Sequence, residues 1–371
     1  MLSYYPLRFH QLTTQLQPIN GSYITLIPKK QNPTMVTDFR PISLMNCSVK
    51  IISKILANRL QPIIRSLIHK NQYSFIKGHS IQDCVAWALE FTHKCKTSKQ
   101  ETLILKLDFT KAFDTVEHST ILFMMHHLGL PQKWIKWSQA ILSLGFSSIL
   151  LNGTPGKFFQ CKRGVRQGDP LSPLLFVLTI DLLQHIINRA AHMGIIQAPK
   201  CHPPDMDFPI IQYVDDTISF LQADQKNTFL LRGLINTFSQ SNGLKVNFRK
   251  SSIIPINVQE ERASLLAKTF GCSIGSFPFQ YLGLPLGPLK PKFKDFNYLM
   301  ENIERRLSST STWLSMVGRL QIVNDVISSL PTYTMCTFKL PSKVIYRIDQ
   351  ARRNFLWCGL NINAGSSSRV A

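Results

Sequence analysis

The sequence lacks paired cysteines, long apolar runs and a signal peptide, and each absence excludes a class of protein. Its eight cysteines are scattered, with no Cys-x-x-Cys and no zinc-type pairing to histidine, so we expect reduced thiols rather than disulfides or a zinc site. No apolar run approaches the roughly 18 residues that cross a bilayer, and the N-terminus has no signal-peptide core. We therefore expect a soluble, intracellular protein without a membrane partner, in either the nucleus or the cytoplasm.

Acidic residues are also scarce, because 42 Lys and Arg face 21 Asp and Glu, a formal net charge of +21. Residues 1–70 contain nine basic residues and one acid, Asp38, and the chain from Lys290 onward contains twelve basic residues and five acids. A polyanionic partner is the natural interpretation, since counterion release drives such binding. Solubility or an acidic membrane surface are alternatives, but a membrane-surface protein would concentrate its charge on one amphipathic helix.

Apolar periodicity and turn residues predict alternating strands and helices in the middle of the chain and helices alone at its end. Strands are predicted at 23–27, 103–108, 149–151, 209–214, 218–221, 245–248 and 252–255. Helices are predicted at 49–60 (capped by Ser48), 63–68, 118–128, 169–191 (beginning at Asp169-Pro170), 227–242, 295–309, 313–329 and 342–357. This order predicts an α+β core with a helical subdomain.

Carboxylates follow two of the predicted strands. Asp215 and Asp216 lie at the tip of a predicted hairpin, and Asp108 ends an apolar strand. Either group alone could be an ordinary turn, and Asp108 or Asp114 could cap the segment that follows. Together they fit phosphoryl transfer, in which carboxylates from separate strands bind two divalent cations roughly 3.5–4 Å apart.

The segment Arg163–Pro173 is a glycine-containing turn that enters a helix. Its glycines would admit a nucleotide or a template strand close to the backbone. An ordinary Asp-Pro helix start is the alternative interpretation.

These motifs, in this order, resemble the reverse transcriptase of plant LINE-type (non-LTR) retrotransposons, from about Asn20 to Gly359. The matching stretches are Leu26-Ile-Pro-Lys-Lys, Asp38-Phe-Arg-Pro-Ile-Ser-Leu, Lys54-Ile-Leu-Ala-Asn-Arg-Leu, Gln72-Tyr-Ser-Phe-Ile-Lys-Gly, Leu107-Asp-Phe-Thr-Lys-Ala-Phe-Asp, Gly164-Val-Arg-Gln-Gly-Asp-Pro-Leu-Ser-Pro, Tyr213-Val-Asp-Asp, Gly243-Leu-Lys-Val-Asn, Tyr281-Leu-Gly and Leu314–Arg319. Each stretch is weakly specific, whereas ten in the family's order are highly specific.

The resemblance implies a right-hand polymerase with fingers, an antiparallel palm with helices, and a helical thumb. The implied boundaries are 1–100 for the fingers, 101–255 for the palm with a finger-side insertion near 131–165, 256–290 for the primer-grip region, and 291–371 for the thumb and tail. The implied reaction is RNA-directed DNA synthesis from deoxynucleoside triphosphates on an RNA template and DNA primer. The implied cofactor is Mg²⁺, with Mn²⁺ as a substitute.

The resemblance also implies roles for individual residues. Asp108 and Asp215 would bind the metal ions, with Asp216 as a weaker ligand. Phe113 would crowd a ribose 2′-hydroxyl, although it could also be a core aromatic. The other implied nucleotide contacts are Lys29, Arg40, Gln167 and Gly168. Lys245 would protonate the leaving pyrophosphate, with Lys250 as a competitor.

The primer grip implied by the resemblance is Tyr281-Leu282-Gly283, which could also be a simple strand and turn. The implied contacts to the nucleic-acid backbone are Arg305, Arg306 and Arg319, each of which could instead be part of a solvated helix face.

Three features depart from the family pattern. His79 replaces the usual arginine, which would weaken a phosphate or template contact, and Val214 stands where plant relatives often have alanine. No endonuclease, zinc-knuckle or RNase H-like segment is visible, so we expect a truncated copy. A catalytically inactive nucleic-acid-binding relic is the alternative, a group II intron-type or telomerase-type enzyme is a rival within the class, and the oligomeric state is open.

Overall fold

The computed structural model describes residue 9, residues 16–308 and residues 314–358, and the predicted tail beyond 358 lies outside this range. The chain divides into two compact units. Unit 1 comprises the chain up to Cys84 and Ser98–Gly275, and unit 2 comprises Val85–Thr97 and the chain from Ser276 onward. Helix α4 (Ile81–Thr97) is therefore divided between them.

The central sheet of unit 1 has the strand order β10-β9-β3-β8-β7. Strand β3 is buried along nearly its whole length and pairs antiparallel with β8 on one side and β9 on the other. Such burial agrees with its largely apolar sequence, in which Lys106 is the one charged residue. The strands are β3 (Thr102–Leu107), β7 (Ile210–Tyr213), β8 (Asp216–Gln222), β9 (Ser252–Ile256) and β10 (Ser273–Ile274).

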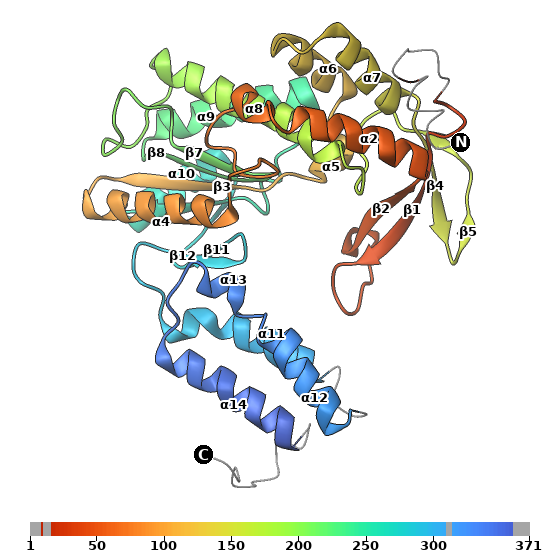
Figure 1. Ribbon diagram of the computed structural model, residues 1–371. Helices are drawn as coiled ribbons and strands as arrows, with labels where there is room; N and C mark the ends of the chain where they lie inside the picture. The colour runs from red at the N-terminus through yellow and green to blue at the C-terminus, as the bar shows by residue number, and fades with distance from the viewer. Residues whose placement is uncertain (1–8, 10–15, 309–313, 359–371) are drawn as a thin grey trace. The chain divides into compact units, whose positions relative to one another are not determined.

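Two long helices, α8 (Ser172–His192) and α9 (Gln225–Asn242), lie side by side against this sheet (Figure 1). Side chains from both helices and from β3 form the main hydrophobic core. Helix α9 begins where the Asp224 carboxylate accepts a hydrogen bond from Asn227 N at 3.0 Å, and it ends at Gly243 with φ +77°. The predicted end of this helix at Gly243 is confirmed, because glycine adopts this left-handed conformation at low cost.

A second sheet of unit 1 has the order β2-β1-β4-β5, and β6 also pairs with β4. Strand β1 pairs antiparallel with β2 and parallel with β4. The strands are β1 (Gly21–Pro28), β2 (Phe39–Met45), β4 (Phe146–Leu151), β5 (Thr154–Pro155) and β6 (Phe159–Gln160). The remaining helices of unit 1 are η1 (Val36–Asp38), α2 (Cys47–Leu60), α3 (Ile64–Leu67), α5 (Ala112–Thr115), α6 (His118–His127), α7 (Gln132–Ser143) and α10 (Glu260–Phe270).

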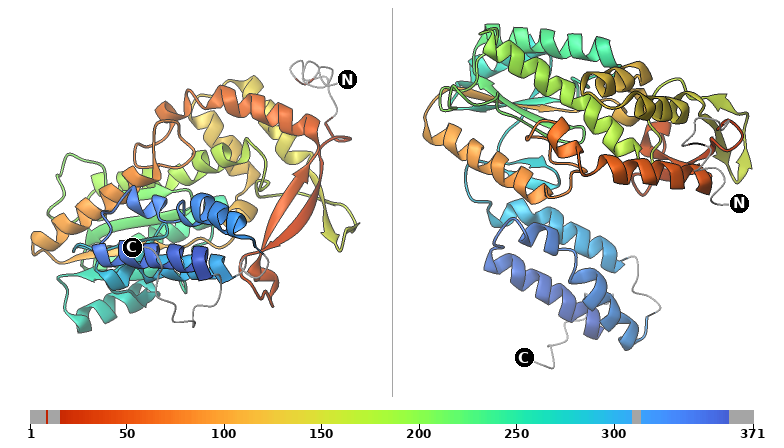
Figure 2. Two further views of the ribbon diagram at one scale, coloured as in Figure 1. Left: turned by 60° about the horizontal axis from the view of Figure 1, so that its bottom comes forward. Right: turned by 45° about the horizontal axis from the view of Figure 1, so that its top comes forward.

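Unit 2 contains a β-hairpin and a group of helices with their own hydrophobic core (Figure 2). The elements are β11 (Phe279–Tyr281), β12 (Leu284–Leu286), η2 (Phe293–Phe296), α11 (Asn297–Ser308), α12 (Met316–Ile322), the π-helical turn η3 (Val323–Ile327), α13 (Thr332–Met335) and α14 (Ser342–Cys358). Helices therefore occupy all three predicted C-terminal segments within the described residues.

Three local predictions are wrong in detail. Helix α2 begins at Cys47 and is capped by the Asn46 side chain, which accepts a hydrogen bond from Ser48 N at 2.9 Å. Helix α8 begins at Ser172 rather than at Pro170, although the predicted capping residue is correct, because the Asp169 carboxylate accepts a hydrogen bond from Ser172 N at 2.9 Å. Residues 245–248 form no strand but a single bridge, from Phe109 to Val246.

Helices α4 and α10 were not predicted from the sequence, although both are amphipathic. Among the described residues one helix, α8, is long and apolar enough to cross a membrane by length and composition, and 72% of that stretch is buried. Core helices pass the same test, so this is weak evidence for a membrane span.

Candidate active site

The hairpin that joins β7 and β8 turns through only two residues, Val214 and Asp215, because Tyr213 pairs directly with Asp216. Val214 has φ +58°, a left-handed conformation that is unfavourable for a β-branched residue. Such strain costs about 1–3 kcal/mol and persists only where the surroundings impose it.

Two buried polar side chains impose this conformation. Val214 N donates to Ser74 Oγ at 2.9 Å and, more weakly, to Gln72 Oε1 at 3.4 Å. Ser74 Oγ in turn donates to Gln72 Oε1 at 2.8 Å, and both side chains are essentially inaccessible to solvent. The turn that presents Asp215 is therefore attached to a segment about 140 residues earlier in the chain.

That earlier segment runs alongside β7 as a short extra edge of the sheet. Gln212 N donates to Asn71 O and Tyr73 N donates to Gln212 O, both at 3.0 Å. The Asn71 side chain also donates to Ile210 O at 2.9 Å. The sequence motif beginning at Gln72 thus has a structural role that its pattern alone did not reveal.

His79 belongs to the same segment. Its Nδ1 lies 3.0 Å from Gln72 O, and its ring centroid lies 5.4 Å from that of Tyr73. His79 therefore contacts the segment that supports the hairpin.

The third carboxylate comes from β3. In the antiparallel pairing of β3 with β8, Leu107 faces Thr217, so the next position brings Asp108 opposite Asp216. Asp108 N donates to Ser251 Oγ at 3.1 Å. The three acids predicted from separate motifs consequently meet at one end of the central sheet.

The electrostatics agree with this proximity. Burial, followed by the negative charge of Asp108, raises the pKa of Asp215. Asp216 remains exposed at the hairpin tip, but partial removal of its hydration, followed by the charge of Asp215, raises its pKa to about 6. Burial also raises the pKa of Asp108, against the opposing charges of Lys250 and Lys106. Crowded carboxylates with raised pKa values are a favourable environment for a cation.

The donor set fits Mg²⁺ or Mn²⁺, although the described residues contain no group of three or more His, Cys, Asp or Glu arranged to hold a metal ion by themselves. Magnesium binds through one or two carboxylates and completes its shell with water and substrate phosphates. An open site of hard oxygen donors is therefore compatible with this ion without a protein cage.

Phe113 stands in helix α5, which follows Asp108. Its ring stacks on the fully buried ring of Phe176, with centroids 4.5 Å apart and an interplanar angle of 13°. The side chain is half-buried. The core interpretation is therefore correct for one side of the ring, and its remaining surface is accessible.

A cluster of polar side chains surrounds Asp114, the residue after Phe113. Gln167 Nε2 donates to Asp114 Oδ1 at 3.3 Å. Burial raises the pKa of Asp114, while Gln167 and the charges of Lys111 and Lys29 oppose that rise. Lys29 and Gln167, predicted separately as nucleotide contacts, thus both act on Asp114. Arg40 is exposed on β2, opposite Ile27 of β1.

Glycine is required at two positions of the 163–173 segment. Gly168 has φ +107°, and a Cβ there would lie 3.3 Å from Ser43 O. Gly164 has φ +80°, and a Cβ there would lie 2.7 Å from Asp114 O. These glycines allow the segment to pass close to other backbone.

The two candidate lysines differ in their surroundings. Lys245 is exposed, and its backbone oxygen accepts from Thr110 N at 2.8 Å. The charge of Lys250, in contrast, acts on Asp108. The competitor named from the sequence is therefore associated with the carboxylates.

The predicted primer-grip residues form a tight turn in unit 2. Tyr281 is buried, Leu282 and Gly283 have φ +50° and +79°, and Tyr333 Oη donates to Leu282 O at 2.7 Å. Arg305 and Arg306 are exposed in the last turn of α11, whereas Arg319 on α12 is half-buried.

Three carboxylates at the end of an antiparallel sheet, with helices against the sheet, are the arrangement of a metal-dependent polymerase palm. Residues 27–286 match the family described as "Reverse transcriptase (RNA-dependent DNA polymerase)", and the chain belongs to this family.

The chain is similar to proteins of mobile elements. It is 25% identical over 351 residues to the Transposon TX1 uncharacterized 149 kDa protein of Xenopus laevis, covering 93% of this chain and 26% of that protein. It is 27% identical over 285 residues to the Retrovirus-related Pol polyprotein from type-1 retrotransposable element R2 of Popillia japonica, covering 76% of this chain and 37% of that protein. The chain thus spans well under half of either relative.

Among solved structures, the telomerase from Candida albicans in complex with a fragment of telomeric RNA has a similar fold. The TM-score is 0.51 at 13% identity, covering 95% of this chain and 61% of that chain. The predicted α+β polymerase fold is therefore confirmed.

Proposed function

We propose that this chain is an RNA-directed DNA polymerase of retroelement origin. It would copy an RNA template by extending a DNA primer with deoxynucleoside triphosphates. The observation that carries the proposal is the meeting of Asp108 with Asp215 and Asp216 where β3 and the β7–β8 hairpin end.

In the proposed reaction, Asp108 and Asp215 would hold two Mg²⁺ ions, and Asp216 would contribute more weakly. When bound, these ions would lower the pKa of the primer 3′-hydroxyl and neutralise charge on the leaving pyrophosphate. Mn²⁺ has the same preference for carboxylate oxygens and would substitute for Mg²⁺. Ser74 and Gln72 keep the turn that presents Asp215 in one conformation.

The nucleotide would bind beside α5. The accessible part of the Phe113 ring would exclude a ribose 2′-hydroxyl. Its stacking on Phe176 would prevent the ring from moving aside to admit that hydroxyl. Gln167 would orient the nucleotide, while Gly168 would let the backbone approach it. Lys29 and Arg40 would neutralise the triphosphate. The proton for pyrophosphate would come from Lys245 or Lys250, and the charge effect on Asp108 supports Lys250.

The proposed domains follow the sequence-based boundaries, with fingers at 1–100, palm at 101–255 including the finger-side insertion near 131–165, primer grip at 256–290, and thumb and tail at 291–371. Tyr281, Leu282 and Gly283 would position the primer end. Arg305, Arg306 and Arg319 would contact the nucleic-acid backbone without reading sequence. The ten ordered motifs further support a plant LINE-type (non-LTR) origin.

Primer extension on poly(rA)/oligo(dT) with purified chain and Mg²⁺ tests the proposal. We expect incorporation by the parent and a loss of at least about a hundredfold for Asp215→Asn, since a neutral amide is a poor ligand for a hard cation. Asp205→Asn, which removes an exposed acid outside the site, should retain full activity.

Binding of the same template–primer, measured by fluorescence anisotropy, separates the alternatives. A parent that binds template–primer but incorporates no nucleotide would establish the inactive relic instead. Equal activity of the parent and Asp215→Asn would contradict the assignment of the carboxylates.

A further inference from the structure

Helix α14 exposes two large aromatic side chains on one stripe. Tyr346 is 61% exposed and Trp357 is 54% exposed. They are eleven residues apart, which is three helical turns, so both project in nearly the same direction about 16 Å apart. Gln350 and Arg353 occupy the same stripe between them. The helix meets the core of unit 2 through other side chains, namely Val344, Ile348 and Phe355.

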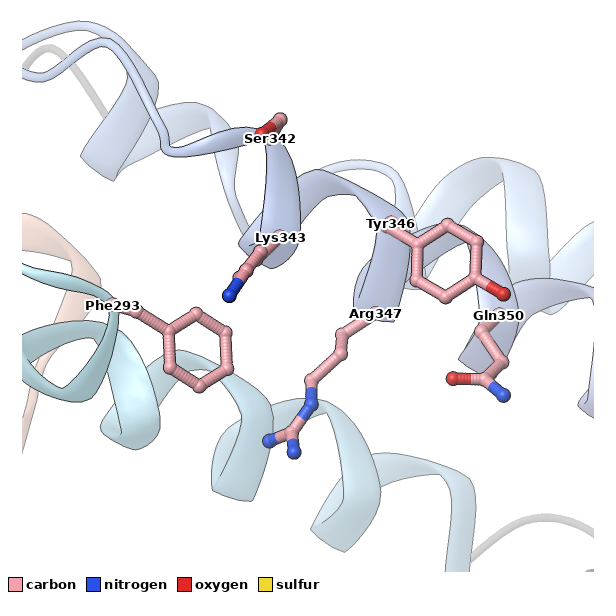
Figure 3. A pocket seen from close by; sticks show the side chains of 6 residues that line it. All are labelled: Phe293, Ser342, Lys343, Tyr346, Arg347 and Gln350. Atoms are coloured by element: carbon pink, nitrogen blue, oxygen red, sulfur yellow. The ribbon is translucent and has the colours of Figure 1, made fainter.

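A groove of about 560 Å³ borders the first half of this stripe. Figure 3 shows the Lys343 ammonium and the Arg347 guanidinium beside the Phe293 ring, with Tyr346 and Gln350 on the same helix. The Arg347 guanidinium lies 4.9 Å from the centroid of that ring. Arg347 therefore lines the groove, and the Tyr346 ring beside it remains exposed.

Positive charge lies on this stripe, at Arg353, and beside it, where Lys343 and Arg347 line the adjoining groove. Helix α14 contains Lys343, Arg347, Arg352 and Arg353 but only one acid, Asp349. Within residues 314–358, Asp349 pairs with Arg352 at 3.0 Å, so three cations of the helix keep their charge for another partner. Exposed aromatics interleaved with such cations are the arrangement that binds unpaired nucleic acid.

We propose that this face of α14 binds single-stranded RNA. Unpaired bases would stack on Tyr346 and Trp357, while Lys343, Arg347 and Arg353 would contact the neighbouring phosphates. Stacking requires free base faces, which a duplex does not offer. A lipid surface is disfavoured, because the apolar side of α14 is turned towards the core rather than outwards. The inference rests on the proposed function for its choice of RNA.

The test measures binding of the full chain to a fluorescein-labelled, unstructured 15-nucleotide RNA and to an RNA–DNA duplex of the same length. We expect Tyr346→Ala/Trp357→Ala to weaken binding of the single strand by about tenfold or more. Binding of the duplex should change less than about twofold, because its stacked bases do not use these rings.

Matched variants separate stacking from general effects. Tyr346→Phe/Trp357→Phe should bind like the parent, because the rings remain. Phe123→Ala removes an equally exposed aromatic from α6 and should have no effect. Lys343→Gln/Arg347→Gln should lower the slope of log Kd against log salt by roughly 1.4, about 0.7 for each lost phosphate contact on a single strand. Far-UV circular dichroism confirms that each variant is folded.

An unchanged affinity of the double alanine variant for the single strand would overturn the inference, as would an equal loss for single strand and duplex. Binding to phosphatidylserine vesicles without binding to RNA would replace it with a membrane surface. Primer extension is measured in parallel. If the parent binds single-stranded RNA but incorporates no nucleotide, only the proposed function is contradicted. If the parent is active but the double alanine variant binds single-stranded RNA as tightly as the parent does, only this inference is contradicted.

Discussion

At the scale of single residues, the unusual position is Val214. A β-branched residue with φ +58° is unfavourable, and its backbone N–H is satisfied by Ser74 Oγ at 2.9 Å rather than by another strand. Because Asp215 follows directly, the direction of its carboxylate depends on this hydrogen bond.

Ser74→Ala should therefore impair catalysis more than binding. The variant leaves the partly buried Val214 N–H with only the longer contact to Gln72, which costs at most about the 1–3 kcal/mol of a fully unsatisfied buried donor. We expect kcat to fall about tenfold with KM for the nucleotide nearly unchanged, as measured by steady-state primer extension. Ser74→Thr should restore most of the rate, and the exposed Ser119→Ala is the control. An unchanged kcat in Ser74→Ala would show that the turn needs no such support.

Gly164 presents a second residue-scale test. Gly164→Ala introduces a Cβ 2.7 Å from Asp114 O at φ +80°, whereas Gly129→Ala has a similar φ of +73° with nothing within 4 Å. The left-handed conformation lowers the free energy of unfolding of each variant by about 1–2 kcal/mol. Any further loss of stability in Gly164→Ala therefore measures the clash of the new Cβ with Asp114 O. We expect its Tm to fall clearly further than that of Gly129→Ala in thermal unfolding. Equal decreases in Tm for the two variants would mean that the backbone at Asp114 moves to accommodate the Cβ at little cost.

At the scale of elements, helix α8 combines an apolar surface with a buried carboxylate. Asp181 is 1% exposed and accepts hydrogen bonds from His69 N and, one turn along the helix, from His185 Nε2 at 3.1 Å. The carboxylate thereby joins α8 to the start of the segment that supports the β7–β8 hairpin.

This contact makes stability depend on pH. The hydrogen bond with Asp181 raises the pKa of His185 above its ordinary 6.5. A group whose pKa is higher in the folded state stabilises fully below its unfolded pKa, and this contribution disappears as pH rises through the folded value. We expect Tm to decrease as pH rises past about 6.5, and His185→Gln to remove part of that decrease. His126→Gln, on an exposed position of α6, should leave the pH profile unchanged, and an identical profile in His185→Gln would contradict the assignment.

At the scale of the whole molecule, the net charge of +21 should make binding to nucleic acid strongly dependent on salt. Each Lys or Arg that contacts a duplex phosphate contributes about 0.9 to the slope of log Kd against log salt. We expect Arg305→Gln/Arg306→Gln to lower the slope for an RNA–DNA duplex by roughly 1.8. Lys268→Gln, an exposed cation of α10, serves as the control. A slope equal to that of the parent would exclude both arginines from the backbone contact.

Most elements were predictable because their signals are local. Helix α9 carries its own cap and its own terminal glycine, and β3 is an apolar run that ends at an acid. The predicted cap of α8, Asp169, is present, but the helix begins two residues after Pro170, because the Asp169 carboxylate accepts from Ser172 N. Residues 245–248 look like a strand but pair at one position only. Thr110 N donates to Lys245 O and Asn247 N donates to Asp108 O, which forms the single bridge, and the chain then turns, because Lys250 N and Ser251 N both donate to Asn247 O.

The sequence by itself determined most of the strands and helices, the positive charge and the identity of the acids, because spacing, capping and composition act over a few residues. Only the tertiary structure decided that Asp108 lies opposite Asp216, that Phe113 stacks on Phe176, and that Ser74 satisfies Val214. The physical reason is distance along the chain, since Ser74 and Val214 are separated by 140 positions. Pairing across such a separation depends on how the sheet and its helices pack, and no local pattern encodes it.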